Sequence, residues 1–133
     1  MPSVMHNDCE ELTLLELLLQ LEGDIRQSLE PIRVTPSQGG VILFLRRHAE
    51  ANVTFAATAL GVRLPTMVEV VKDLVHKRWV TKRYSVEDRR TASLRLSRQG
   101  HALALQIEQR VRQVEATLDE QDRKALGMNQ KCG

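Results

Sequence analysis

The stretch from Asn52 to Leu96 constrains the fold of this chain more than any other. A short helix is predicted from Thr54 to Leu60, then a tight turn at Gly61-Val62, then a second helix from about Pro65 to Arg78. Gly61 suits the turn because glycine takes a positive φ without a Cβ clash. Pro65 suits the first turn of a helix, where its missing N–H costs little. The sequence therefore predicts two helices joined by a sharp turn.

The second of these helices has two distinct faces. Its apolar residues recur at the spacing of one buried face: Met67, Val70, Val71, Leu74 and Val75. Its other side is polar and free to meet a partner: Thr66, Glu69, Lys72, Asp73 and His76. After it, Trp79 to Tyr84 and Ala92 to Leu96 predict two short strands joined by a charged hairpin. This order is typical of a winged helix-turn-helix, a unit that binds DNA.

The predicted first helix carries more leucine than one buried face needs. It runs from Asp8 to about Glu30, where Pro31 breaks it, and one stripe consists of Leu14, Leu18, Leu21, Ile25 and Leu29. Further leucines widen the apolar surface: Leu12, Leu15, Leu17 and Leu19. A helix that is apolar on more than one side is usually covered on more than one side. In a chain of 133 residues, the simplest cover is a second copy of the protein.

Three more helices complete the predicted fold. The capping-box spacing of Thr35 and Gln38 predicts a helix to about Ala49, whose two adjacent glycines indicate close helix packing. A long helix follows Ser97 and ends near Leu118, and a short one is expected between Asp119 and Met128. The predicted fold class is mainly α, with a small wing of two or three β-strands.

Charge is distributed unevenly along the chain. Residues 1–30 hold seven acidic residues and one basic residue, a balance of −6. Residues 76–101 hold eight basic residues and two acidic ones, a balance of +6. We expect a polyanion to be drawn to the basic part only, with the acidic end helping to orient it.

Several short phrases in this order resemble the MarR (multiple-antibiotic-resistance regulator) family of bacterial transcription factors. They are Val34-Thr35-Pro36-Ser37-Gln38, Ala59-Leu60-Gly61-Val62, Pro65-Thr66-Met67, Glu87-Asp88-Arg89-Arg90 and Leu96-Ser97-Arg98-Gln99-Gly100. The resemblance implies one domain over residues 1–133, with dimerisation helices at 8–30 and 98–128 around a winged helix-turn-helix at 35–96. It also implies a cytoplasmic homodimer that binds a palindromic DNA duplex, as a repressor.

The resemblance assigns candidate residues to these two tasks. The helix from Pro65 would enter the major groove, and Arg90 at the wing would reach the minor groove while Asp88 orients arginine side chains. The candidate DNA contacts are Arg63, Thr66, Glu69, Lys72, Arg83, Asp88, Arg89 and Arg90. Thr66 and Lys72 are assigned to phosphates. The candidate dimer contacts are Leu14, Leu18, Leu21, Ile25, Val111, Val114 and Leu118.

The recognition helix departs from the family pattern. Arg63 and Leu64 stand where many relatives have a small hydroxyl residue and an arginine, and Val68 and Glu69 replace residues that are often polar or basic. Val68 can touch a thymine methyl group, and Glu69 can accept a hydrogen bond from cytosine N4. An acid near phosphates also lowers affinity. The alternative hypothesis is therefore a degenerate winged helix that serves as a protein-interaction module, with weak or no DNA binding.

Many MarR relatives respond to a small aromatic effector, and a branch of the family senses hydroperoxides. An effector pocket between the dimer base and the winged helix would be lined by Leu18, Gly39, Phe44, His48 and Ile107, although core packing also explains the apolar members. Cys9 lies where the hydroperoxide-sensing branch has its reactive cysteine, but the tyrosines that accompany that cysteine are absent.

Other classes of function receive little support from the sequence. The histidines are scattered, no nucleophile elbow or phosphate-binding glycine loop occurs, and Cys9 and Cys132 lie far apart without a CxxC motif. No enzyme activity, metal or cofactor is therefore expected. The chain also lacks an export signal and a long apolar run, so no association with a membrane is expected.

Overall fold

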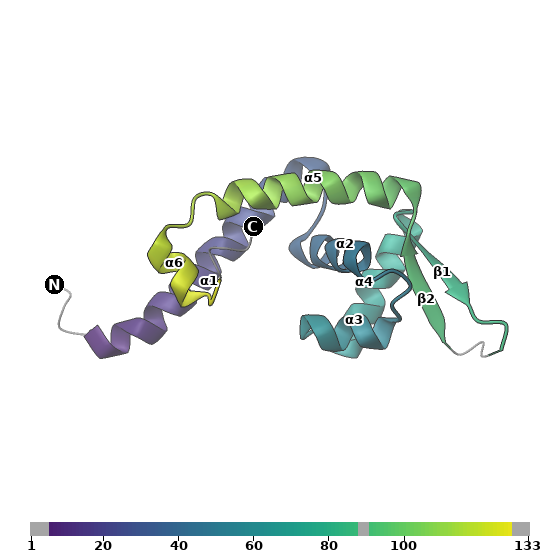
Figure 1. The fold of residues 1–133 in the computed structure, drawn as a ribbon, viewed down its shortest axis with the longest axis horizontal. Helices are drawn as coiled ribbons and strands as arrows, with labels where there is room; N and C mark the ends of the chain where they lie inside the picture. The colour runs from purple at the N-terminus through teal and green to yellow at the C-terminus, as the bar shows by residue number, and fades with distance from the viewer. Residues whose placement is uncertain (1–5, 88–90, 129–133) are drawn as a thin grey trace.

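The computed structural model describes residues 6–87 and 91–128, with side chains from Leu14 onward. The described chain is mainly helical and carries a two-stranded antiparallel sheet, which confirms the predicted fold class. The elements are α1 (His6–Leu29), η2 (Glu30–Ile32), α2 (Pro36–Arg47), α3 (Val53–Leu60), α4 (Leu64–His76), β1 (Val80–Tyr84), β2 (Ala92–Leu96), α5 (Arg98–Glu115) and α6 (Glu120–Ala125). In Figure 1, α5 runs along the top of the molecule, with α2, α3, α4 and the sheet gathered below one end and α1 and α6 toward the other.

Helix α2 begins at the predicted capping box. The Thr35 hydroxyl oxygen accepts from the Gln38 N–H at 3.1 Å, and Gln38 Oε1 accepts from the Thr35 N–H at 3.0 Å. The helix ends at Arg47, two residues before the predicted end at Ala49. The reason lies beyond the helix, where Ala51 pairs with the second strand and its carbonyl oxygen accepts from the Leu94 N–H at 2.8 Å.

The two central helices form as predicted around Gly61. Asn52 caps α3, and Gly61 ends it with a φ of +67°, the left-handed conformation that favours glycine. Helix α4 begins at Leu64 and ends at His76, so the predicted end at Arg78 was too late. Arg78 itself has a φ of +65°, which turns the chain out of the helix and into β1.

The sheet is a two-stranded wing. Val80 pairs with Leu96 at its base and Tyr84 with Ala92 toward its tip. Val80, Leu94 and Leu96 are buried, so the base of the wing is anchored in the core while its outer part projects from the body (Figure 1).

The core lies within the winged helix and under α5. Its largest fully buried side chains are Leu29, Ile42, Met67, Leu74, Leu94 and Ile107. Of the stripe predicted to be apolar on α1, only Leu29 is buried, whereas Leu14 and Leu18 are exposed. Leu17, which lies outside that stripe, is buried instead. The reason is visible in Figure 1, because the N-terminal half of α1 extends away from the winged helix.

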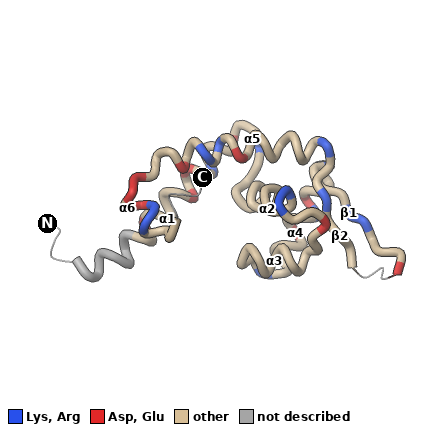
Figure 2. The backbone as a smooth tube through the Cα atoms, viewed as in Figure 1, with Lys and Arg blue, Asp and Glu red and all other residues tan. Residues whose placement is uncertain are grey.

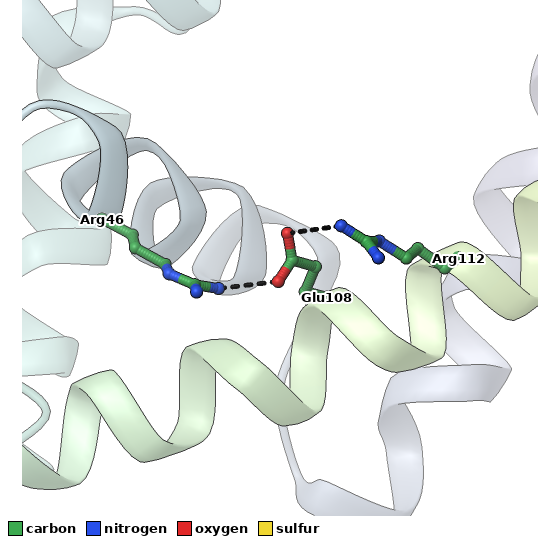
Figure 3. A network of polar contacts seen from close by, with 3 residues as sticks. All are labelled: Arg46, Glu108 and Arg112. Carbon is green, nitrogen blue, oxygen red and sulfur yellow. Dashed lines mark hydrogen bonds and ion pairs between the residues drawn. The ribbon is translucent and has the colours of Figure 1, made fainter. Parts of the chain in front are cut away.

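Polar contacts tie α5 to the helices beneath it. Arg110 Nη1 donates to the Ser28 carbonyl oxygen of α1 at 2.9 Å. Arg46 of α2 contacts Glu108 at 2.7 Å, and Arg112 contacts the other oxygen of Glu108 at 3.2 Å (Figure 3). The hydrogen bond from Arg46 and the charges of both arginines lower the pKa of Glu108 below its usual value. These contacts hold α5 against both α1 and α2.

Among the helices of the described residues, none is by itself long and apolar enough to cross a membrane. Taken together, the bent pair of helices Val53–Leu60 and Leu64–His76 has the length and composition of a membrane span. These two helices are the α3 and α4 of the winged helix.

Candidate nucleic-acid interface

The exposed face of α4 is the central feature of the candidate interface. Met67, Val71 and Leu74 are buried against the core, as their spacing predicted. The opposite side of the helix carries Glu69 and Lys72, both exposed. Arg63 immediately precedes the helix and Thr66 lies in its first turn, and both are also exposed. The four candidate contacts at this helix are therefore all exposed to solvent.

Asp73 does not belong to this exposed face, and its prediction as a free polar residue was wrong. It is half-buried and accepts a hydrogen bond from Gln38 Nε2, while Lys77 Nζ lies 3.6 Å from the same oxygen, Asp73 Oδ2. Gln38 is the one buried polar residue of the described core and completes the capping box through its other side-chain atom. One amide group thus joins the start of α2 to α4, a link that local sequence patterns did not reveal.

This link provides a test of how α4 is held in place. Gln38→Ala removes the acceptor of the Thr35 N–H and the amide donor to Asp73, so we expect the free energy of unfolding to fall by about 1–3 kcal/mol. Denaturant unfolding followed by circular dichroism measures the change. The matched control is Gln106→Ala, at an exposed glutamine of α5, which should leave stability nearly unchanged. Equal stability of the two variants would contradict this role for Gln38.

The wing that follows this helix carries exposed basic side chains. Lys82 and Arg83 are exposed on β1, and Figure 2 shows basic residues on this strand. The predicted contacts Asp88, Arg89 and Arg90 lie outside the described residues. The charge of the wing is therefore described only up to Glu87 on one side and from Thr91 on the other.

A shallow hollow at the side of the wing was not predicted from the sequence. It has a volume of about 310 Å³ and is lined by Glu50, Asn52, Arg83, Tyr84, Ser85, Thr91, Ala92 and Ser93. Asn52 is also the N-cap of α3, so the hollow joins the start of that helix to the wing. The pairing of Ala51 with Leu94 brings these segments together, and no local sequence signal indicates it.

The five candidate effector-pocket residues do not lie together. Two are in the core, two form a stacked ring pair, and one is on the surface of α1. A Cβ added at Gly39 would lie 3.5 Å from Ile107, so these two residues pack together in the core. The Phe44 and His48 rings stack with their centroids 4.5 Å apart. Leu18 is exposed on α1. Gly40, in contrast to its neighbour Gly39, has open space around it.

The candidate dimer contacts combine exposed and half-buried side chains. Leu14 and Leu18 are exposed, and Val114 is buried within the protomer. The half-buried members are Leu21, Ile25, Val111 and Leu118. Leu15 and Leu19, which were not among the candidates, are exposed beside Leu14 and Leu18. The N-terminal half of α1 therefore presents a leucine surface that its own protomer leaves uncovered.

The arrangement matches solved structures along most of its length. The repressor CouR, bound to a 23-mer DNA duplex, has a TM-score of 0.81 at 24% identity, covering 95% of this chain and 92% of CouR. A cysteine-to-serine mutant of MarR from E. coli, complexed with operator DNA, has a TM-score of 0.77 at 20% identity, covering 92% of this chain and 91% of MarR. BpsR from Bordetella bronchiseptica has a TM-score of 0.78 at 18% identity, covering 88% of this chain and 86% of BpsR.

Sequence comparison locates the family signal in the winged helix. No curated protein matches this chain. A family model described as the MarR family matches residues 34–91, which extend from the start of α2 into the wing. The MarR family model thus covers the winged-helix part of the chain, and the solved structures share its fold.

Proposed function

We propose that this protein is a sequence-specific DNA-binding transcriptional regulator that acts as a homodimeric repressor on a palindromic operator. The observation that carries the proposal is the exposed polar face of α4 together with the exposed basic residues of the wing strand that follows it. Helix-turn-helix proteins place this part of the second helix against base edges in the major groove. CouR is a transcriptional repressor bound to DNA, and MarR has been solved with operator DNA, which supports the same use of the fold here.

The exposed residues divide by chemistry into two roles. Lys72 and Arg83 are cations suited to phosphate oxygens, and the hydroxyl group of Thr66 can donate a hydrogen bond to the same oxygens. Arg63 and Glu69 are proposed to contact bases from the first turns of the helix. By resemblance to the family, the wing tip at residues 88–90 adds the minor-groove contacts. Binding would thus combine a general electrostatic attraction with base readout.

An effector is proposed at the junction of the winged helix and the helical base. Regulation of DNA binding by 6-hydroxynicotinic acid is the subject of the BpsR structure. A small aromatic acid of this kind would contact the exposed ring of His48, which stacks on the buried ring of Phe44. The proposed response is a change in the spacing of the two recognition helices of the dimer.

Salt dependence tests the proposed DNA binding. Each cation that neutralises a phosphate releases counterions, so affinity for a duplex should fall steeply as salt rises. We expect Lys72→Ala and Arg83→Ala each to weaken binding and to reduce the slope of log affinity against log salt by about one. Fluorescence anisotropy measures both quantities with a labelled duplex that carries the DNA sequence upstream of the gene for this protein. Arg112→Ala, an exposed arginine on α5, is the control and should keep the slope.

The competing function is a protein-interaction module built on the same fold. The exposed apolar residues Leu64 and Val68, together with the acidic Glu69, are the observations that favour it. Affinity for duplex DNA that is absent, or indifferent to salt, would favour this module over the proposed regulator.

A further inference from the structure

We propose that Leu64 and Val68 determine the sequence specificity of this protein by contacting thymine methyl groups in the major groove. The inference rests on the proposed DNA-binding function and deepens it. It names the chemical feature of the operator that the helix recognises.

Both side chains are exposed at the part of α4 that would face the bases. Leu64 is 45% exposed and Val68 44% exposed, whereas Met67 and Leu74 on the same helix are completely buried. The two residues lie one helical turn apart, so their side chains are neighbours on one face. They occupy the first two turns of the helix, which supply the base contacts in helix-turn-helix proteins. The N-terminal part of α4 thus presents two adjacent apolar side chains to the bases.

The remaining exposed apolar residue of this region has a different explanation. Phe55, on α3, has its ring centroid 5.5 Å from that of Phe44 and 5.7 Å from that of His48. Its ring therefore takes part in an aromatic cluster with α2. Leu64 and Val68 are exposed on α4 and remain available to a partner of the helix.

Thymine is the base that an apolar pair can select. Among the four bases, thymine alone presents a methyl group in the major groove, while the other edges offer mainly hydrogen-bonding groups that Leu and Val cannot satisfy. Glu69, the next residue, is exposed, and no hydrogen bond or ion pair engages its side chain within residues 14–87 and 91–128. Its carboxylate can accept from the N4 amino group of cytosine and is repelled by the acceptor edge of guanine. Side by side, these residues match a half-site of thymines flanking a cytosine.

Replacing thymine by uracil tests this readout, because it removes the methyl group and keeps the base pair. A tight site is first selected from random duplexes with the purified full chain, then synthesised with each thymine replaced in turn by uracil. We expect the affinity of the unaltered protein to fall about fourfold for each contacted methyl group. Val68→Ala or Leu64→Ala should bind the thymine duplex more weakly and lose the sensitivity to uracil at its own position. Thermal unfolding verifies that these exposed substitutions leave the fold intact.

Lys72→Ala is the matched control on the same helix. Because Lys72 is assigned to phosphate, this variant should lose affinity equally for the thymine and uracil duplexes. Tight binding that is equal for both duplexes would overturn the methyl readout and leave the proposed function standing. Uracil sensitivity that persists unchanged in both Val68→Ala and Leu64→Ala would also overturn it. Failure to select any duplex would remove the proposed function and this inference together.

Discussion

Gly100→Ala is expected to lower the free energy of unfolding by at least about 2 kcal/mol, because the added methyl group has nowhere to go. A Cβ at this position would lie 2.1 Å from the Trp79 carbonyl oxygen and 3.1 Å from its carbonyl carbon. That oxygen accepts from the Ser97 N–H at 2.9 Å, so it is fixed at the junction of the wing and α5. A backbone carbonyl group cannot rotate away as a side chain can. Relief of the steric clash would therefore require α5 to shift relative to β1. Chemical denaturation followed by circular dichroism measures the loss.

The matched control lies in α2. A Cβ added at Gly40 would meet nothing within 4 Å, and replacing a glycine inside a helix by alanine stabilises it by about 1 kcal/mol. Gly40→Ala should therefore raise the free energy of unfolding while Gly100→Ala lowers it. If both substitutions shift the midpoint in the same direction, the contact at Trp79 does not constrain the fold.

These two glycines illustrate what the sequence could predict. Features set by neighbouring residues were predicted correctly, including the capping box of Thr35 and Gln38 and the left-handed turn at Gly61. The close approach at Gly100 joins two segments that are separate in sequence. The phrase that contains Gly100 indicated the family, but the physical reason for the glycine needed the three-dimensional contact.

The site was predictable to a similar extent. Helical periodicity separated the buried face of α4 from its exposed face, because the core covers one side only. It failed at Asp73, since the partner that holds this residue, Gln38, lies on another helix. It also left Leu17 outside the predicted stripe of α1 although this residue is buried, because the leucine pattern does not reveal which side of a helix its neighbours cover.

Dimerisation through α1 is the remaining prediction of large effect, and it follows from leucines that the protomer leaves exposed. Leu14, Leu15, Leu18 and Leu19 are all exposed on the half of α1 that extends from the body. Soluble proteins rarely leave so many large apolar side chains together in water. A second copy of the chain can cover them, since a two-fold axis brings the same surface from each copy into contact.

Leu18→Glu should therefore separate the dimer without unfolding the protomer. Each buried leucine contributes about 1.5 kcal/mol, and the substitution occurs in both copies, so about 3 kcal/mol is lost and the dimer dissociation constant rises at least about 100-fold. Sedimentation equilibrium measures this constant, and thermal unfolding at high concentration reports on the fold.

Gln20→Glu is the control for the added charge, because Gln20 is an exposed polar residue on another side of the same helix. It should leave the dimer intact, which separates the loss of leucine contacts from repulsion between acids. In DNA binding, Leu18→Glu should reduce affinity for a palindrome toward that for a single half-site, since one protomer presents only one recognition helix. A Leu18→Glu protein that sediments as a dimer, or a wild-type chain that sediments as a monomer, would show that this leucine surface is not the interface. The uracil test on a half-site duplex would still apply to each protomer, because Leu64 and Val68 lie on α4, separate from α1.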